Sequence, residues 1–255
     1  MQALFDELTR IVGPGACTPN PDPADPRLLD ERQNYRGRAS AIVSPRTTAE
    51  VAAVVAVCAN AGLAVVPQGG NTGYCGGATP DEHGRSVLLC VSRMNRVRAI
   101  DTAAATMTAE AGVVLADGQA AAAEHGLLLP LGMGSQGSCQ LGGNLSTNAG
   151  GLSVLRYGTA RELVAGLEVV LPDGRVFSDL RGLRKDNTGY DLKQLFLGAE
   201  GTLGVITAAV LRLQPQPPCY LTAWLGITRV DQALQLLGKL RAALGDCVTS
   251  CEYIA

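Results

Sequence analysis

The feature that most constrains this chain is a glycine-rich stretch, Pro67-Gln-Gly-Gly-Asn-Thr-Gly-Tyr-Cys-Gly-Gly77, which follows the apolar run Leu63–Val66. Five glycines in eleven residues leave few side chains to bury. Glycine and asparagine tolerate positive φ, so such a stretch can turn sharply and direct several backbone N–H groups into one concavity. A concavity of this kind binds anions, most often phosphate. The stretch therefore predicts an anion-binding loop at a strand end; the alternative is a tight turn without a ligand.

Glycine is also concentrated in two later stretches, Gly132–Gly151 and Gly198–Gly204. The chain holds 31 glycines in 255 residues, well above the usual ~7%. Because ordinary sequence separates the three stretches, we expect three backbone segments to converge on one ligand.

Composition and charge restrict the class of protein. Hydrophobic residues make up 47% of the chain and charged residues 17%, as in globular proteins. The net charge is −2 without a basic cluster, so nucleic acid is not expected as a partner. No apolar run approaches the ~18 residues of a membrane span. Asp6 and Glu7 argue against a targeting peptide, and we expect a cytoplasmic protein.

Cysteine and histidine usage argues against a metal centre. The eight cysteines show no C-x-x-C spacing, so we expect reduced and mostly buried thiols. The two histidines, His83 and His125, stand apart, and no metal site is expected.

Hydrophobic periodicity predicts a β-α-β unit over residues 41–66. A strand at Ala41–Val43 precedes a helix opened by a capping box of Thr47 and Glu50. Apolar residues then recur at i, i+3, i+4 and i+7 (Val51, Val54, Val55 and Cys58), before the strand Leu63–Val66. The first glycine loop thus lies at the carboxyl end of a strand, where open α/β sheets bind ligands.

The rest of the chain predicts mainly strands. The expected strands are Ser86–Cys90, Val97–Ile100, Ala105–Ala111, a hairpin of Leu163–Leu171 with Arg175–Phe177, and Val205–Leu213; the expected helix is Val113–His125. Pro215, Pro217 and Pro218 mark a boundary. Beyond it we expect a second β-α-β made of strand Tyr220–Ile227, helix Val230–Leu244 and a strand from Thr249.

A dinucleotide fingerprint is spelled by Gly132-Met-Gly-Ser-Gln-Gly137. That motif requires a long helix directly after it and an acidic residue about 20 positions on. Residues 139–151 add further glycines, and no acid stands at the expected place. The sequence therefore disfavours an NAD-binding Rossmann unit.

Several longer motifs resemble one family, the FAD-linked oxidases of the vanillyl-alcohol-oxidase type, in the branch of D-2-hydroxyglutarate and D-lactate dehydrogenases. The motifs are Pro67–Gly73, Ser92-Arg-Met-Asn-Arg96, Gly142–Gly151, Arg156-Tyr-Gly158, Lys185–Phe196 and Gly201–Ile206. The resemblance implies an α+β, PCMH-type fold in which a β-α-β subdomain and a mainly antiparallel subdomain hold FAD between them. It implies a helix and connector in residues 1–34, an FAD-binding domain in 35–217, and the incomplete start of a substrate domain in 218–255.

The resemblance also implies which residues contact FAD. The pyrophosphate would lie against Pro67, Gln68, Gly69, Gly70, Asn71, Thr72 and Gly73, with Gly132, Gly137 and Ser138 opposite. The flavin and ribityl chain would meet Gly142, Gly143, Asn144, Thr147, Asn148, Gly150 and Gly151, and strand backbone would come from Gly204, Val205 and Ile206. Because the pyrophosphate loop has no histidine, we expect non-covalent FAD.

The family oxidises D-2-hydroxy acids by hydride transfer to the flavin. Its catalytic base and metal-binding histidines lie in the substrate domain, so no catalytic residue is assigned here; Asn187 and Tyr190 are expected to border the substrate pocket. We expect a small 2-hydroxy acid as substrate, an unknown electron acceptor, and a chain inactive without the missing domain. A partner subunit or homodimer, and a non-catalytic or partner-dependent flavin-binding subunit, stay open as alternatives.

Overall fold

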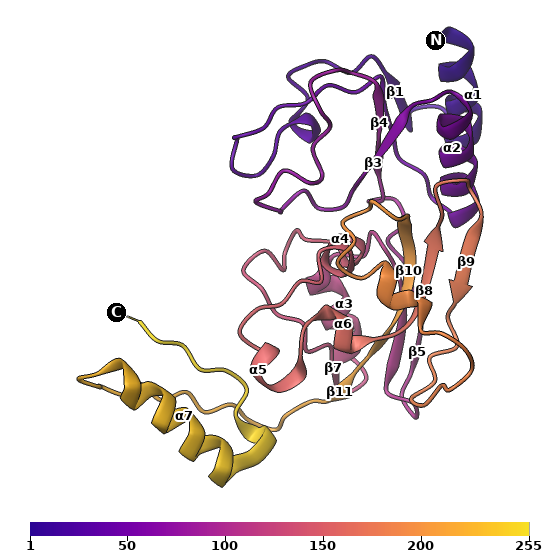
Figure 1. The fold of residues 1–255 in the computed structure, drawn as a ribbon. Coiled ribbons are helices and arrows are strands. Elements are labelled where there is room, and N and C mark those ends of the chain that lie inside the picture. Colours follow the sequence, from indigo (N-terminus) through magenta and orange to yellow (C-terminus); the bar gives the residue numbers. More distant parts are fainter. Residues whose placement is uncertain (255) are drawn as a thin grey trace.

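The computed structural model describes residues 1–254, in which two α+β subdomains are stacked and a C-terminal segment projects from the second (Figure 1). The first subdomain contains a four-stranded sheet of order β1-β2-β4-β3. Its elements are α1 (Gln2–Val12), β1 (Cys17–Pro19), the 3₁₀ turn η1 (Pro26–Leu28), β2 (Ala41–Val43), α2 (Thr48–Asn60), β3 (Ala64–Gln68) and β4 (Ser86–Cys90). β2 and β3 both run parallel to β4. The β-α-β prediction is confirmed, with β4 inserted between its two strands.

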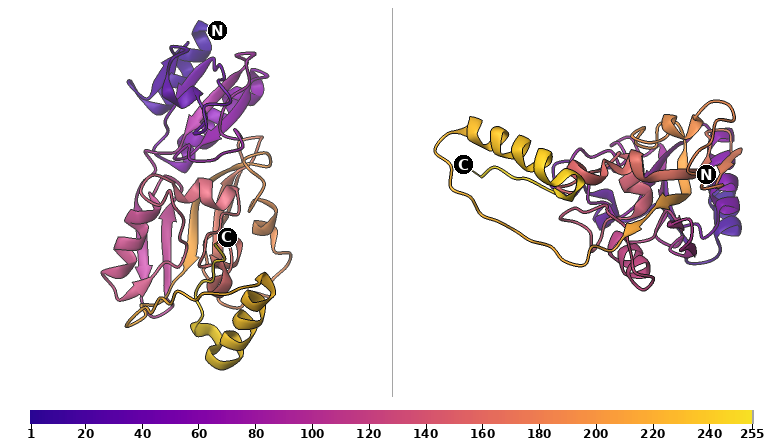
Figure 2. Two further views of the ribbon diagram at one scale, coloured as in Figure 1. Left: turned by 90° about the vertical axis from the view of Figure 1, so that its left-hand side faces the viewer. Right: turned by 90° about the horizontal axis from the view of Figure 1, so that it is seen from below.

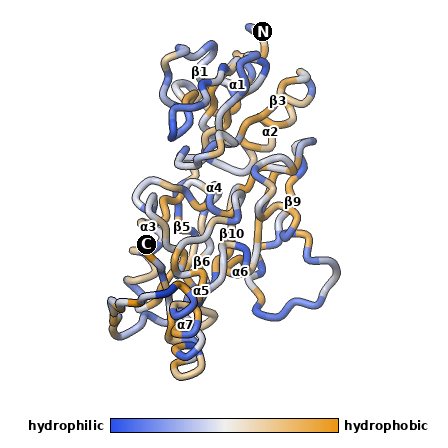
Figure 3. The backbone as a smooth tube through the Cα atoms, turned by 60° about the vertical axis from the view of Figure 1, so that its left-hand side comes forward, coloured by the Kyte–Doolittle hydropathy of each residue, from blue (hydrophilic) through white to orange (hydrophobic). Residues whose placement is uncertain are grey.

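Helix α2 forms for the reasons that the sequence indicates. The Thr47 hydroxyl accepts a hydrogen bond from the Glu50 N–H at 3.1 Å. The Glu50 carboxylate accepts from the Arg46 N–H at 2.7 Å, one residue before the position that a capping box predicts. The four predicted apolar residues are all buried, against α1 and the sheet. Figure 3 shows the resulting hydrophobic tract through α2 and β3.

The second subdomain is built on an antiparallel sheet of order β5-β6-β10-β8-β9. Its strands are β5 (Val97–Asp101), β6 (Thr106–Glu110), β8 (Val164–Val170), β9 (Val176–Asp179) and β10 (Val205–Arg212). Its helices are α3 (Leu115–Ala123), α4 (Leu141–Ser146), α5 (Val154–Tyr157) and α6 (Ala160–Leu163); β7 (Leu127–Leu128) pairs with β11 (Gln214–Pro215), and η2 (Leu192–Leu195) is a 3₁₀ turn. The expected β-α-β plus antiparallel α+β architecture is confirmed.

One helix appears where glycine-rich loop was expected. α4 occupies Leu141–Ser146, inside the second glycine stretch. Leu141 and Leu145 are buried in the core, and the Leu141 and Gly142 N–H groups donate to the carbonyls of Val113 and Ala111. Tertiary contacts therefore override the low helix propensity of glycine. At six residues, α4 is still far shorter than the helix of a dinucleotide fingerprint.

The prediction for the C-terminal segment is wrong in two elements. Tyr220–Ile227 and the residues from Thr249 form no strand, whereas α7 (Val230–Leu244) does form and buries none of its residues. Figure 2 shows this segment standing away from both sheets. A strand gains its hydrogen bonds from a neighbour, and none pairs with these residues within 1–254. A short 3₁₀ turn, η3 (Gly245–Cys247), follows α7.

The expectation of mostly buried cysteines is also wrong. Cys58, Cys90 and Cys139 are buried, but Cys75, Cys219, Cys247 and Cys251 are exposed; all eight are free thiols. Three of the exposed ones lie on the projecting segment, which has no core to bury them. None of the helices in the described residues has the length and apolarity that a bilayer crossing requires.

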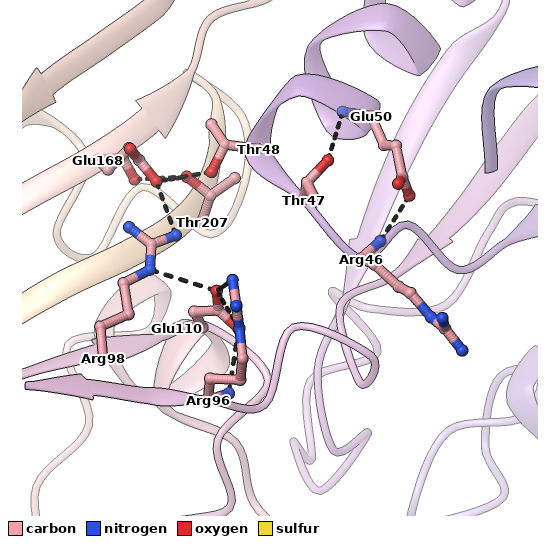
Figure 4. A network of polar contacts seen from close by, with 9 residues as sticks. All are labelled: Arg46, Thr47, Thr48, Glu50, Arg96, Arg98, Glu110, Glu168 and Thr207. Atoms are coloured by element: carbon pink, nitrogen blue, oxygen red, sulfur yellow. Dashed lines mark hydrogen bonds and ion pairs between the residues drawn. The ribbon is translucent and has the colours of Figure 1, made fainter.

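Glu110, the last residue of β6 in the second sheet, is a buried carboxylate that binds two arginine side chains (Figure 4). Glu110 is 1% exposed and accepts hydrogen bonds from Arg96 Nη2 at 2.8 Å and Arg98 Nε at 3.2 Å. Burial acts to raise the pKa of Glu110, but the hydrogen bonds from Arg96 and Arg98 outweigh it and hold that pKa below its usual value. The ion pairs of Glu110 with Arg96 and Arg98 therefore stabilise the fold only while Glu110 is ionised.

We predict that Glu110→Gln lowers the free energy of unfolding by about 1–3 kcal/mol near neutral pH, because charge-assisted hydrogen bonds are lost. Because the pKa of Glu110 is lower in the folded state than in the unfolded state, ionised Glu110 stabilises the fold at pH values above the unfolded-state pKa. This stabilisation is lost as the pH falls through the folded-state pKa. The difference in the free energy of unfolding between wild type and Glu110→Gln should thus shrink below about pH 4.5. Urea denaturation of both proteins between pH 3 and pH 7 measures it; a pH-independent difference would contradict this account.

Candidate cofactor-binding site

The first glycine loop is held in shape by side chains that point away from its open face. Gln68 is 3% exposed, and its Nε2 donates to the carbonyls of Arg27 and Ala78, both at 2.9 Å. Asn71 has a φ of 52°, and its Nδ2 donates to the Leu29 carbonyl at 2.8 Å. Both amides therefore anchor the loop to residues 27–29, and the Gln68 side chain has a structural role rather than the predicted contact with a ligand.

The same loop carries a run of unused hydrogen-bond donors. Within the described residues, no N–H from Gly69 to Gly73 donates to a protein acceptor. Consecutive N–H groups around a residue in the left-handed conformation, here Asn71, form the concavity that binds anions. Five donors without acceptors leave the loop able to hold a polyanion.

The three glycine stretches are in contact. A Cβ on Gly70 would lie 2.1 Å from the Ser138 carbonyl oxygen, so the two main chains touch. A Cβ on Gly201 would lie 2.9 Å from Pro67 Cγ, which brings in the third stretch. The loops of the first subdomain thereby face α4 of the second (Figure 1).

Some glycines here have no structural explanation within the protein. Most glycines of the described chain either have a positive φ or would place a Cβ against a neighbour. Outside the projecting C-terminal segment, those with ordinary φ and no atom within 4 Å of a Cβ are Gly73, Gly134, Gly137 and Gly143. All four lie in the first two glycine stretches. Gly73, Gly134 and Gly137 are exposed and Gly143 is half-buried, so a methyl group at any of the four would meet no protein atom and would enter only the space outside the loops.

Other predicted residues have structural roles. The Asn148 Oδ1 accepts from the Arg161 N–H at 2.9 Å, and the Thr147 hydroxyl donates to the Gly143 carbonyl at 2.9 Å. Asn144 is buried and donates to Cys139 Sγ at 3.5 Å. Packing requires further glycines: a Cβ on Gly142 would overlap Ala111, on Gly150 Val154, and on Gly151 the Gly132 carbonyl, whereas a Cβ on Gly132 would only touch the Ser153 hydroxyl.

Asn187 and Tyr190 lie on the exposed segment between β9 and η2, and Tyr190 is 93% exposed. Among the described residues, neither Asn187 nor Tyr190 forms a hydrogen bond with the glycine loops.

A cavity of about 250 Å³ opens between the subdomains behind the loop. The predicted residues Pro67, Gly204 and Val205 line it, whereas Ile206 is buried and does not. Sequence reasoning missed Val65, Gly201, Thr202 and the α2 residues Val55 and Ala59. Strand alternation could have found Val65, because residues two apart on β3 share a face.

The two buried thiols of the first subdomain are unreactive, whereas Cys75 in the glycine stretch is an exposed free thiol. Burial raises the pKa of the Cys90 thiol, which contacts Gln68, and of Cys58 to about 11. Both thiols are therefore protonated at neutral pH. The described residues contain no cluster of three or more His, Cys, Asp or Glu side chains that could hold a metal ion.

Residues 39–179 match the family described as "FAD binding domain". The chain belongs to this family. The FAD binding domain thus covers β2 through β9, which includes the first two glycine stretches. The family membership that the loop motifs indicate is confirmed.

Relatives of this FAD-binding chain are longer than the chain itself. A mitochondrial D-2-hydroxyglutarate dehydrogenase of Bos taurus is 45% identical over 97% of this chain and 45% of its own length. A D-2-hydroxyglutarate–pyruvate transhydrogenase of Saccharomyces cerevisiae is 41% identical over 88% and 45%. The chain therefore spans under half the length of these relatives. The mitochondrial location in the bovine name does not support the expected cytoplasmic location.

A solved alkyldihydroxyacetonephosphate synthase has the same fold, with a TM-score of 0.77, 22% identity, and coverage of 86% of this chain and 41% of its own. The PCMH-type arrangement expected from the motifs is confirmed by this likeness together with the family match.

We predict opposite stability effects for two alanine substitutions in the glycine stretches. Gly70→Ala should destabilise the ligand-free protein by about 1–3 kcal/mol, because its Cβ would overlap the Ser138 carbonyl. Gly137→Ala should leave stability unchanged or raise it by up to about 1 kcal/mol, because the backbone is ordinary and the space is open. Thermal melts of the two variants provide the comparison, and equal losses would argue against the observed loop contact.

Proposed function

We propose that this chain is the FAD-binding portion of an oxidoreductase that acts on a D-2-hydroxy acid. One observation carries the proposal: five consecutive N–H groups, from Gly69 to Gly73, have no protein acceptor, and they lie where the first glycine stretch meets the second. FAD fits this arrangement, because its pyrophosphate is an anion that N–H groups can hold and its length needs a cleft free of side chains. The family match supports the same cofactor.

The residues divide among the parts of FAD. The N–H groups of Gly69, Gly70, Asn71, Thr72 and Gly73 would hold the pyrophosphate, with Gln68 as their anchor. Gly137, Ser138 and Gly143 would face the chain that leads to the flavin, and Asn144, Thr147, Asn148, Gly150 and Gly151 would support that wall. The cavity at Pro67, Gly204 and Val205 would take the adenine, because its apolar walls suit a flat ring. We propose non-covalent binding, because the pyrophosphate loop contains no histidine to which FAD could be attached.

FAD when bound supplies the hydride acceptor for oxidation of a hydroxy acid. This chain's residues bind and orient it, and we assign no proton-transfer group to any of them. The substrate class is proposed from the bovine and yeast relatives, whose names refer to D-2-hydroxyglutarate. Because those relatives are more than twice as long, the groups that contact substrate are proposed to come from polypeptide corresponding to their remaining length. Asn187 and Tyr190 would then border that pocket.

Alanine substitutions at the open glycines test the cofactor site. We predict that Gly143→Ala weakens FAD binding at least about tenfold, equivalent to ~1.4 kcal/mol, because its methyl group enters the cofactor space. The ligand-free variant should be as stable as wild type or more so, since alanine favours helix α4. FAD titration by fluorescence quenching measures the affinity.

Gly226→Ala is the matched control, because this glycine also has ordinary φ and open space but lies on the projecting segment. It should bind FAD like wild type. If wild type binds no FAD, the proposal fails; if Gly143→Ala binds as tightly as wild type, the assignment of Gly143 fails.

Anaerobic reduction tests the reaction. The FAD-loaded chain alone should keep its flavin absorption in D-2-hydroxyglutarate or D-lactate. Flavin bleaching should appear when the same chain is joined to polypeptide matching the remaining half of the relatives. Flavin that binds and is never reduced in the joined protein would instead support a non-catalytic or partner-dependent flavin-binding subunit.

A further inference from the structure

A side-chain hydrogen bond from a threonine hydroxyl to a glutamate carboxylate joins helix α2 to the second sheet (Figure 4). Thr48, the first residue of α2, donates from its hydroxyl to Glu168 Oε1 on β8 at 2.7 Å. Thr207 on β10 donates to the same oxygen at 2.9 Å, and Arg98 Nη2 lies 3.4 Å from it. Only the Thr48 bond crosses between subdomains; the other two stay within the antiparallel sheet.

A second contact lies further along the same helix. Gly174, in the β8–β9 turn, has a φ of 85°, and a Cβ there would lie 3.0 Å from both the Ala52 carbonyl and Ala56 Cβ. The turn therefore packs directly on the middle of α2. Together with the Thr48 bond, it fixes the distance and the angle between α2 and the β8–β9 hairpin.

The cavity proposed for adenine begins where these contacts end. One wall is the later part of α2, at Val55 and Ala59, and the other is the end of β8 and the start of β10. Val55 is seven residues after Thr48, about 10 Å along the helix. Glu168 is two residues before Val170, which lines the cavity, so both side chains lie on one face of β8. A change of tilt at Thr48 would therefore alter the width of the cavity.

We propose that Thr48 and Glu168 are positioning residues for the cofactor, whose hydrogen bond sets the width of the cavity that receives the adenine end. This inference rests on the proposed FAD site. Neither residue lines the cavity, so their effect passes through helix α2. The carboxylate suits this role because two hydroxyls and a guanidinium fix its orientation from three directions.

Three variants of the full chain test the proposal. Thr48→Val keeps the shape of the side chain but removes the bond, and should weaken FAD binding about three- to tenfold, the value of one hydrogen bond. Thr48→Ser keeps the hydroxyl and should bind like wild type. Thr108→Val, on β6 of the same sheet, is the matched control, because its hydroxyl makes no hydrogen bond to Glu168; it should bind FAD like wild type.

FMN lacks the adenine end of FAD. Comparing the affinities for the two flavins therefore distinguishes a positioning role of Thr48 from a general loss of folding or binding. FMN affinity should be the same in wild type and Thr48→Val, so the variant should lose part of the preference for FAD over FMN. Unchanged FAD affinity in Thr48→Val, or equal losses for FAD and FMN, would overturn the proposal. Wild type that binds neither flavin would overturn the proposed function instead, so the two failures are distinguishable.

Discussion

The structure depends on one close approach of main chain to main chain, between Gly70 and the Ser138 carbonyl. A Cβ on Gly70 would lie only 2.1 Å from the Ser138 carbonyl oxygen, so no other residue fits without moving one loop. The contact packs the residues that follow β3 against those that precede α4. It joins the two subdomains at the end of the site that carries the N–H donors, which we call the front. Side chains there would hold the loops apart, and backbone N–H groups would then be out of reach of a ligand.

The same arrangement leaves hydrogen-bonding capacity unused. A backbone N–H buried without a partner costs roughly 1–3 kcal/mol, so a folded protein leaves several such groups together only where water or a ligand can reach them. The Gly69–Gly73 loop keeps its five donors without protein acceptors, and the side-chain amides of Gln68 and Asn71 hold the loop in place. Binding an anion therefore needs little rearrangement, which lowers its entropic cost.

The sequence predicted the elements whose signal is local. The periodicity of Val51, Val54, Val55 and Cys58 located α2, and the expected strands Ala105–Ala111 and Val205–Leu213 correspond to β6 and β10. The sequence-based predictions were wrong where contacts with residues distant in the sequence decide the secondary structure. α4 contains two glycines and forms because buried leucines and the Val113 and Ala111 carbonyls receive it. Tyr220–Ile227 has strand-like composition and forms none, because a strand needs a partner.

The candidate site shows the same division. Glycine spacing identified all three loops, but could not separate glycines needed for turns or packing, such as Gly151 and Gly201, from those beside open space, such as Gly137 and Gly143. That distinction depends on what surrounds each missing Cβ. Nor could sequence assign Gln68 to an anchoring role, because its partners, the Arg27 and Ala78 carbonyls, lie 41 and 10 residues away.

The two ends of the cleft are held by different kinds of contact, and this difference has a consequence for binding. The front is fixed by packed main chain, which cannot lengthen without losing contact. The back is held by the Thr48–Glu168 hydrogen bond and the Gly174 turn, which together set the width of the cavity. Recognition of a ligand would therefore depend on the geometry of the N–H donors at the front, and on the fit to a cavity of set width at the back.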